Sequence, residues 1–600
     1  MNIDIIGEYP YYRDQPQLWR KKLLAMKEIG ITHVSCYVPW RHHCSGPTSA
    51  MVFDSGDRDL EGFLRLMTEL QMKCLIKPGP FIHAEVQLGG IPDFLSPSHD
   101  PSLAIAYSDR GLDCDSGAAP MMSQGKYLPH FEDPCFQRYW IEWLTIFAQK
   151  ILNRYLHPHG PIVSVQLGNE GIYSDANLPL KCPLGTREDQ ASALIPAQLL
   201  AKRLQKMRQI IENVVKKFTS SFTFIATMPL PSRMGERKDD APLDYHSWNK
   251  RIIPQLWGEN IEYAFGSWVG NPLESVRAFW GKTWAIRRSC RASNTEENWG
   301  FLWDDPQINQ HAHQIFPAIM ALSGGAQAIS IYCACATAHW GESIDLDRDF
   351  VKKQFGDEKF FGPPYAADAP INYQGEITEK GRWLQDLCTF LRASRCDSRC
   401  VRECRSVYEG MDDPLVILFD EQLTEDYERE VLAPAKVLYQ LGVPFVFRSI
   451  NEVLEQFKGE CFRNFVVTTT NQLLQQTVAK LLPTPSILIS AAANATTFEQ
   501  QIKELFPQQI IFSQSQEDLY GSLLQYDNDH ILFILNRSNC DRNFVGALMP
   551  LNLKFEGAIT AEGAAMVRFF VPGDPAGDPA KYSAGYSVYS SAASVFRVFV

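Results

Sequence analysis

The chain has 600 residues, of which 45% are hydrophobic and 12% aromatic, and its net charge is −12. This composition is typical of a folded protein with several domains and excludes a disordered chain. Because no basic stripe accompanies the negative charge, the composition also argues against a nucleic-acid partner. No apolar stretch reaches about 18 residues, so we expect no helix that spans a membrane.

Up to about residue 395, segments typical of strands alternate with segments typical of helices. The predicted strands cover residues 32–38, 72–77, 161–167, 222–228, 261–265, 283–288 and 328–332. The helices predicted between them include residues 18–29, 60–70, 136–155 and 195–217. This alternation indicates an α/β fold in which strand–helix units close into a (β/α)8 TIM barrel over residues 1–395, with long loops at the C-terminal mouth of the strands.

A second pattern of strands and helices covers residues 405–515. Its predicted strands are 414–419, 444–447 and 465–469, and its predicted helices are 429–441 and 451–457. They indicate a smaller doubly wound α/β domain of the flavodoxin or amidotransferase type. The segment has no glycine-rich phosphate loop, which favours a structural or oligomeric role over nucleotide binding.

From about residue 520 the helical pattern ends. Strands are predicted at 530–536 and 565–571 with no helix between them. Successive strands without intervening helices are typical of a β-sandwich. We therefore predict a C-terminal β-sandwich domain over residues 520–600.

The 15 cysteines are scattered, and no Cys-x-x-Cys pair has the spacing of a zinc site. Cys396, Cys400 and Cys404 follow the spacing of one helix face, but no fourth ligand follows at a useful distance, so we expect no metal there. Met1 is followed directly by structured sequence, without a basic and then apolar leader. We expect a reduced cytoplasmic protein without metal or organic cofactor.

Asn169 and Glu170 are the most informative residues for function. They follow the uncharged segment 161–167, which is typical of a strand buried on both faces. A carboxylate at the C-terminal mouth of such a strand lies where barrel enzymes perform their chemistry. An asparagine beside it can hydrogen-bond a sugar hydroxyl. For the dipeptide alone, a helix-capping pair in an ordinary loop is the alternative.

Six ordered motifs over nearly 400 residues resemble the barrel of glycoside hydrolase family 35 β-galactosidases. They are GEYPYYR at 7–13, CYVPW at 36–40, FDSG and DLEGF within 53–63, KPGPFIHAE and GGIPDFL within 77–95, QLGNE at 166–170, and DAP with TEK within 368–380. The α/β domain followed by a β domain resembles instead family 42 β-galactosidases, in which the α/β domain mediates trimers. The resemblance implies a retaining β-glycosidase with a small carbohydrate substrate, and a possible homo-oligomer, either trimer or dimer.

Carried over residue by residue, this resemblance implies roles for several residues. Glu170 is the expected general acid/base, and Asn169 is expected to hydrogen-bond the sugar 2-hydroxyl. Glu85 and the backbone around Ala84 are expected to hold hydroxyls on the far side of the same sugar, and Tyr37 to line the pocket. An ion pair between Glu85 and a barrel arginine such as Arg13 is the alternative for that carboxylate.

The nucleophile is less clearly marked. Retaining hydrolysis needs a second carboxyl group about 5–5.5 Å from the acid/base, and the family carries it at the end of the seventh strand. The segment EENWGF at 296–301 places it at Glu296, at the family's usual interval before Tyr332. Glu297 is the second candidate.

The predicted strand 283–288 supports a different alignment. If it is the seventh strand, the nucleophile position falls near Ser289, where there is no carboxylate, and Arg287 and Arg288 come to the barrel mouth. A guanidinium there suits an anionic substrate or an ion pair with Glu170. This alignment predicts a non-catalytic carbohydrate-binding barrel that has lost its nucleophile.

Two residues of the expected sugar pocket depart from the family. His83 stands where the family has a cysteine, and Ala367 stands where the family has a tyrosine before the Asp-Ala-Pro motif. Tyr365 can take the place of that tyrosine if the loop shifts, and with Tyr332 it is a candidate for substrate binding. Both departures leave the sugar and the linkage open.

Overall fold

The computed structural model covers the barrel and the two smaller units. It describes residues 3–44, 46–47, 50–108, 119–123, 125–171, 195–216, 218–219, 222–231, 245–258, 260–267, 270–288, 293–300, 309–338, 365–393, 415–420, 431–450, 452, 464–467, 487–490, 495–506, 511–513, 516–526, 529–548, 553–570, 585–590 and 594–599. The run Cys396, Cys400 and Cys404, Ser289, most of the predicted helix 451–457 and the predicted boundary at 395–405 lie outside these residues.

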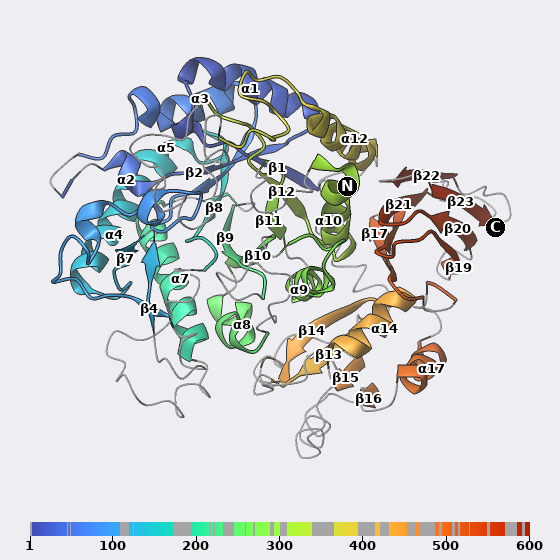
Figure 1. The fold of residues 1–600 in the computed structure, drawn as a ribbon. Coiled ribbons are helices and arrows are strands. Elements are labelled where there is room, and N and C mark those ends of the chain that lie inside the picture. The colour runs from blue at the N-terminus through green and yellow to red at the C-terminus, as the bar shows by residue number, and fades with distance from the viewer. Residues whose placement is uncertain are drawn as a thin grey trace.

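Eight parallel strands close into a barrel at the centre of the larger unit (Figure 1). In order around the barrel they are β1 (Asp4–Glu8), β2 (His33–Tyr37), β3 (Lys73–Lys77), β8 (Ile162–Gln166), β9 (Thr223–Met228), β10 (Ile261–Ser267), β11 (Ser293–Asn298) and β12 (Ala328–Tyr332). Every residue of β2 is buried, as expected of a strand covered on both faces. The predicted TIM barrel is therefore confirmed.

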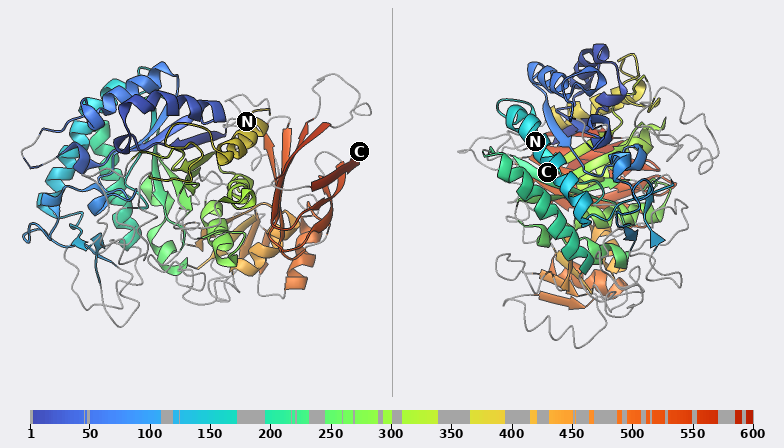
Figure 2. Two further views of the ribbon diagram at one scale, coloured as in Figure 1. Left: turned by 45° about the horizontal axis from the view of Figure 1, so that its top comes forward. Right: turned by 90° about the vertical axis from the view of Figure 1, so that its left-hand side faces the viewer.

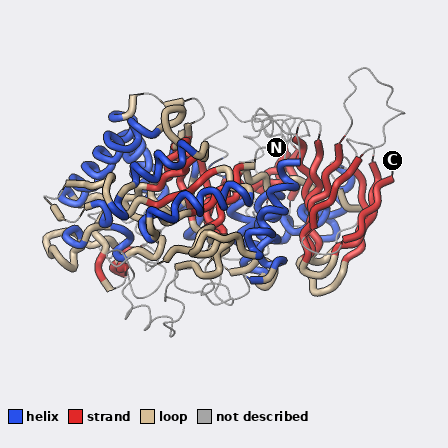
Figure 3. The backbone as a smooth tube through the Cα atoms, turned by 90° about the horizontal axis from the view of Figure 1, so that it is seen from above, coloured by secondary structure: helices blue, strands red, loops and turns tan. Residues whose placement is uncertain are grey.

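Helices surround the barrel (Figures 1 and 3). They are α1 (Pro16–Ile29), α2 (Trp40–His43), α3 (Leu60–Glu69), α4 (Pro134–Phe147), α5 (Asn153–Tyr155), α7 (Ile195–Val214), α8 (Tyr245–Arg251), α9 (Val276–Arg287), α10 (His311–Ser323) and α12 (Glu379–Ala393). Local signals set several of their ends. Asp59 caps α3 by accepting from the Gly62 N–H, and Asp133 caps α4 by accepting from the Cys135 and Phe136 N–H groups.

The predicted strand at 283–288 is wrong, because residues 283–287 belong to helix α9. Ser275 begins this helix by accepting a hydrogen bond from the Ala278 N–H at 3.2 Å. Every residue from 278 to 287 is buried, so the apolar pattern is continuous and conceals the helical period. The seventh strand is instead β11, with the sequence SNTEEN. Glu296 and Glu297 thus lie on the strand itself and not on a loop beyond it.

The α/β unit contains a four-stranded parallel sheet in the order β14-β13-β15-β16. Its elements are β13 (Leu415–Phe419), α14 (Ala433–Leu441), β14 (Phe445–Ser449), β15 (Asn464–Val467), β16 (Ile487–Ser490) and α17 (Ala495–Leu505). This sheet is the additional α/β unit that the sequence predicts.

The C-terminal unit is built from two antiparallel sheets that face each other (Figure 2). One contains β17 (Leu519–Tyr526), β18 (Asp529–Asn536), β21 (Gly563–Phe570) and β22 (Gly585–Ser590); the other contains β19 (Arg542–Leu548), β20 (Leu553–Ile559) and β23 (Ser594–Phe599). Leu532 and Val567 of the first sheet share one core with Phe544 and Phe555 of the second. The predicted sandwich architecture is present.

Helices α9 and α10 join the barrel to both smaller units. The ring of Phe279 on α9 lies 6.0 Å from the Tyr439 ring of α14 and 4.6 Å from the Tyr520 ring of β17. At the end of α9, Arg288 forms a two-point ion pair with Glu452, with N–O distances of 2.8 and 2.5 Å. Both side chains are 1% exposed. No helix in the described parts of the chain is both long and apolar enough to cross a membrane.

We expect Glu452→Gln to lower the temperature of thermal unfolding. Burial opposes the ionised form of Glu452, but Arg288 and Arg448 lower the pKa of its carboxyl. Removing one partner leaves the buried Arg288 without its counter-charge, which costs about 3–5 kcal/mol. Differential scanning calorimetry measures the effect. Arg20→Gln, which breaks the exposed Arg20–Glu69 pair, is the control and leaves the transition in place. Equal transitions in wild type and Glu452→Gln would contradict this role.

Candidate active site

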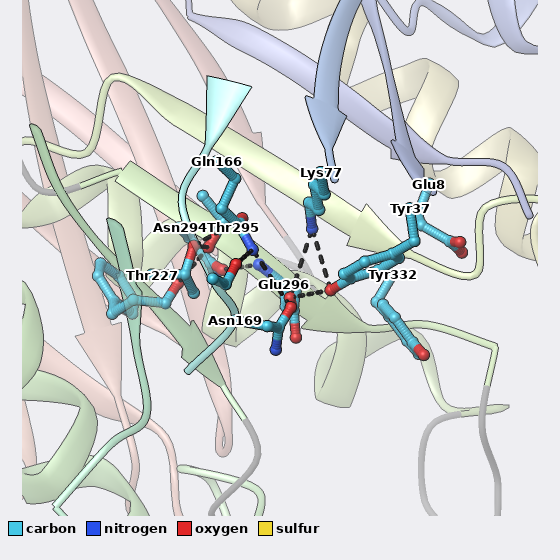
Figure 4. Close-up of polar contacts among 12 residues, drawn as sticks. Glu8, Tyr37, Lys77, Gln166, Asn169, Thr227, Asn294, Thr295, Glu296 and Tyr332 are labelled. Carbon is cyan, nitrogen blue, oxygen red and sulfur yellow. Dashed lines mark hydrogen bonds and ion pairs between the residues drawn. The ribbon is translucent and has the colours of Figure 1, made fainter. Parts of the chain in front are cut away.

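The C-terminal ends of four strands bring a carboxylate, an amine, a phenol and an amide together (Figure 4). Glu296 on β11 is 3% exposed, and its Oε1 accepts a hydrogen bond from the Tyr37 hydroxyl of β2. The Lys77 ammonium of β3 lies 3.3 Å from the same oxygen and 3.2 Å from the Tyr37 hydroxyl. Burial, followed by the charge of Glu296, raises the pKa of Tyr37 well above its ordinary value. Tyr37 therefore remains a hydrogen-bond donor to the Glu296 carboxylate.

Asn169 completes this group from the loop after β8. Its side-chain amide lies 2.8 Å from the Tyr37 hydroxyl and 3.3 Å from Glu296 Oε1, and with its nitrogen toward these oxygens it donates to both. Asn169 is fully buried. The sequence-predicted residues Tyr37, Asn169 and Glu296 thus meet at one place.

A chain of hydrogen bonds beneath the mouth fixes these strand ends relative to each other. The hydroxyls of Thr295 and Thr227 are 2.8 Å apart, and Thr227 donates to Gln166 Oε1 at 2.7 Å. The other end of the Gln166 amide donates to the Gly168 carbonyl at 3.1 Å. On β11, the Glu296 N–H donates to Asn294 Oδ1 at 2.9 Å. The buried polar residues of β11, β9 and β8 are therefore satisfied by one another.

Glu297 faces a different environment from Glu296. Both of its carboxylate oxygens accept from the Lys282 ammonium of α9, at 2.9 and 2.7 Å, and Asn294 donates to it as well. Successive side chains of a strand point to opposite faces, which turns the two neighbouring carboxylates toward different partners. Glu297 is held in a buried ion pair against α9, and this pairing favours Glu296 over Glu297 as the nucleophile candidate.

Glu170 lies in a tightly held loop after β8. Its φ is +45°, a left-handed value that is strained for a residue other than glycine. The Asn169 N–H donates to the Gly171 carbonyl at 3.0 Å, and the Gly171 N–H donates to the Thr227 carbonyl at 2.8 Å. The Glu170 side chain is 13% exposed, and its Oε2 lies 3.3 Å from His83 Nε2. Burial raises the pKa of Tyr37 most, and the charges of Glu296, Glu8 and Glu170 raise it further.

Glu85 forms another wall of the site with two tyrosines. Its Oε2 accepts from the Tyr332 hydroxyl at 2.6 Å and from the Tyr365 hydroxyl at 2.8 Å. Tyr365 is fully buried, whereas Ala367, at the family's tyrosine position, is exposed. Tyr365, and not Ala367, therefore contributes to this wall.

Arg13 supports this wall through the backbone. Its guanidinium donates to the carbonyl oxygens of Ala84 and Glu85, each at 2.9 Å, and lies 4.1 Å from the centre of the Tyr365 ring. Ala84 and Glu85 have φ values of +45° and +49°. Arg13 thus stabilises a strained turn that presents the Glu85 carboxylate.

Glu8 and Lys77 are site residues that the sequence reasoning missed. Lys77 is fully buried at the end of β3, and Glu8 is 1% exposed at the end of β1. Burial raises the pKa of Glu8 to about 8, although Lys77 and Arg13 oppose the shift, and its Oε2 accepts from the Cys333 N–H. At neutral pH Glu8 is mostly protonated, so the positive charge of Lys77 is balanced by the Glu296 carboxylate. A charged residue at the end of an apolar strand was the available signal.

Arg287 and Arg288 are not at the barrel mouth, which corrects the alignment on 283–288. Arg287 lies against the rings of Tyr439 and Phe445, at 4.8 and 4.6 Å from their centres. Arg288 pairs with Glu452. Both arginines extend from the end of α9 toward the α/β unit, so they give no support to an anionic pocket or to a lost nucleophile.

The sequence of the first part of the barrel matches a known family. The profile of Glycosyl hydrolases family 35 matches residues 3–104. The resemblance to family 35 is confirmed over this segment. The Beta-galactosidase of Mus musculus is 31% identical over 166 residues, which cover 28% of this chain and 21% of that protein. The Exo-beta-D-glucosaminidase of Thermococcus kodakarensis is 30% identical over 174 residues, which cover 28% of this chain and 20% of that protein. The chain thus matches only about a fifth of the length of these relatives.

Solved structures resemble this chain over almost its whole length. The beta-galactosidase from Bacillus circulans sp. alkalophilus has a TM-score of 0.58 at 10% identity and covers 94% of this chain and 99% of its own. Gan42B, a GH42 beta-galactosidase from G. stearothermophilus, has a TM-score of 0.57 at 9% identity and covers 99% of this chain and 98% of its own. At such low identity these likenesses concern the fold. A segment that matches the family 35 model thus occurs in a chain whose fold resembles the folds of these solved β-galactosidases.

We expect Glu8→Gln to change how stability depends on pH. The unfolded Glu8 loses its proton near pH 4.5, whereas the folded one keeps it up to about pH 8. The folded state therefore binds an extra proton between these values, and wild-type stability falls as pH rises through the window. The glutamine variant lacks this loss, so its melting temperature relative to wild type increases from pH 5 to 8 and then levels off.

Thermal melts in matched buffers from pH 5 to 9 measure this difference. Glu28→Gln, at an exposed position of α1, is the control, and its difference from wild type stays flat across the range. A flat difference for Glu8→Gln as well would contradict a neutral buried Glu8.

Proposed function

We propose that this protein is a retaining β-glycosidase, most closely β-galactosidase-like, that hydrolyses terminal β-linked sugars. The observation that carries the proposal is the pair of carboxylates at the barrel mouth, Glu296 on the seventh strand and Glu170 after the fourth. The family 35 match at residues 3–104 supports this reaction class. The names of the curated relatives support galactose as the first sugar to test.

In the first step, Glu170 donates its proton to the glycosidic oxygen while Glu296 attacks the anomeric carbon. The bond to the leaving group breaks as the bond to Glu296 forms. In the second step, Glu170 removes a proton from water, and the resulting oxygen displaces Glu296 from the sugar. Tyr37 and Lys77 hold Glu296 Oε1, which fixes the carboxylate for attack and stabilises its charge when the sugar leaves.

The remaining residues of the mouth suit a neutral sugar. We assign Asn169 to the 2-hydroxyl, because its amide already lies beside the nucleophile. We assign Glu85, with the backbone at Ala84, to hydroxyls on the far side of the ring. Tyr332 and Tyr365 orient the Glu85 carboxylate by donating to it and line the same wall. The reaction uses protein carboxyl groups alone and needs no cofactor.

A non-catalytic sugar-binding barrel is the second candidate, and the position of α9 weakens it. A lost nucleophile would place Arg287 and Arg288 at the strand end, but both side chains extend to the α/β unit. The homo-oligomer (trimer or dimer), the cytoplasmic location and the domain limits 1–395, 405–515 and 520–600 remain predictions.

We expect both Glu170→Gln and Glu296→Gln to abolish most hydrolysis of p-nitrophenyl β-D-galactoside or a related aryl β-glycoside. Loss of the general acid/base costs about 10²–10⁴-fold in rate, and loss of the nucleophile removes the covalent route. The melting temperature of Glu170→Gln stays within a few degrees of wild type, because its side chain is partly exposed. Activity assays and thermal melts check both statements.

Covalent trapping identifies the nucleophile directly. With a dinitrophenyl glycoside, Glu170→Gln releases dinitrophenolate rapidly, because this leaving group needs no proton, but it is slow to hydrolyse the sugar–enzyme bond. Mass spectrometry of peptides therefore finds the sugar on Glu296. Glu297→Gln added to Glu170→Gln is the matched control and keeps the label on Glu296. Sugar on Glu297, or full activity in Glu170→Gln, would contradict the assignment. Sugar binding by calorimetry without turnover across a glycoside panel would favour the sugar-binding barrel.

A further inference from the structure

The loop after β3 brings an imidazole against the carboxyl group that we assign as acid/base. His83 Nε2 lies 3.3 Å from Glu170 Oε2, and the two side chains are 36% and 13% exposed. We propose that His83 is a positioning residue that shares a proton with Glu170 and sets the upper pH limit of catalysis. This inference rests on the proposed glycosidase function, and it assigns a role to the position at which this chain departs from the family 35 cysteine.

The position of His83 is fixed by its own loop. The Val86 N–H donates to the His83 carbonyl at 3.1 Å and closes a turn through Ala84 and Glu85. Arg13, itself fully buried, donates to the Ala84 and Glu85 carbonyls of this strained turn. The same turn therefore directs His83 to the acid/base on one side and Glu85 to its two tyrosines on the other.

A ring contact restrains the imidazole further. The Phe81 ring meets it edge-on, with 4.9 Å between the ring centres and an angle of 85°. Phe81 in turn packs over Gly89, where a Cβ atom would lie only 2.0 Å from the Phe81 ring. This close packing leaves Phe81, and hence His83, little room to move.

Glu170 is held from the opposite side. The Gly168 N–H donates across to the Gly79 carbonyl at 3.4 Å, which ties the loop after β8 to the loop after β3. Together with the bond from Gly171 to the Thr227 carbonyl, this contact fixes the backbone on both sides of Glu170. Two restrained loops therefore present the imidazole and the carboxyl group to each other.

Of the other described charges at the mouth, Lys77 contacts Glu296, Glu85 accepts from Tyr332 and Tyr365, and Arg13 donates to backbone carbonyls. Tyr37 from β2 and Lys77 from β3 both contact Glu296 Oε1, and Glu296 itself faces the mouth from β11. His83 is in direct contact with the Glu170 carboxyl. At 3.3 Å, a rotation of the imidazole lets an imidazolium donate to an ionised Glu170, or a neutral imidazole accept from a protonated Glu170.

This sharing has a definite consequence for the pH profile. An imidazole is ordinarily a stronger base than a carboxylate by about two pH units. When His83 and Glu170 together hold one proton, that proton resides mainly on His83. The protonated Glu170 that the first step needs is therefore lost at a lower pH than it would be without the imidazole. The proton returns to the pair from water in the second step, so no net proton is consumed in a turnover.

The first test is the pH dependence of kcat/KM in His83→Gln, whose amide can still hydrogen-bond Glu170 but does not titrate in this range. We expect its alkaline limb to move up by at least about half a pH unit, and the acid limb to stay in place. His159→Gln, at an exposed position before β8, is the control and moves neither limb. A uniform fall in rate with both limbs unmoved would mean a purely structural role and would overturn the proposal.

The second test does not depend on activity. Nuclear magnetic resonance of histidine-labelled protein follows the His83 titration, with its signal assigned by its absence from His83→Gln. Replacing Glu170 with Gln removes the neighbouring negative charge, so the His83 midpoint moves down by at least about half a pH unit. An unchanged midpoint would overturn the pairing. If the midpoint moves while no glycoside is hydrolysed, the pairing stands and the proposed function fails.

Discussion

Glu296 carries its carboxylate almost entirely out of water, and a buried charge of this kind persists only with compensating partners. The Tyr37 hydroxyl and the Lys77 ammonium supply that compensation, and each belongs to a different strand. The barrel must therefore close with β2, β3 and β11 in one fixed register. Burial keeps Tyr37 protonated and Glu8 largely neutral, so the positive charge of Lys77 acts on one carboxylate.

Helix α9 connects this site to the rest of the chain. Lys282 on the helix neutralises Glu297 of β11, one residue from the proposed nucleophile. One end of the same helix pairs with Glu452, and its Phe279 packs between α14 and β17. The α/β unit and the C-terminal sandwich thus support the barrel along the side that carries β11. A displacement of α9 would change the surroundings of the Glu297 carboxylate first and those of Glu296 next.

The sequence reasoning succeeded and failed for physical reasons. Asn169 and Glu170 were found because they follow an apolar strand, where a polar residue stands out, and Glu85 was found through the resemblance to family 35. The seventh strand was misplaced because α9 is buried on every side and resembles a strand, whereas β11 is polar. The side chains of β11 take part in the site and in its ion pairs and do not form an apolar core. Lys77 and Glu8 were passed over because their partners are distant in the chain.

By itself, the sequence determined the (β/α)8 barrel, the parallel α/β sheet and the sandwich, because hydrophobic period and segment length are local properties. It also determined the candidate acid/base and the pair of possible nucleophiles. Only the tertiary structure decided that Glu296 faces Tyr37 and Lys77 while Glu297 faces Lys282, since neighbouring residues of a strand differ only in what the fold packs against each face. The same reason explains why Arg287 and Arg288 lie away from the barrel mouth and why His83 lies beside Glu170.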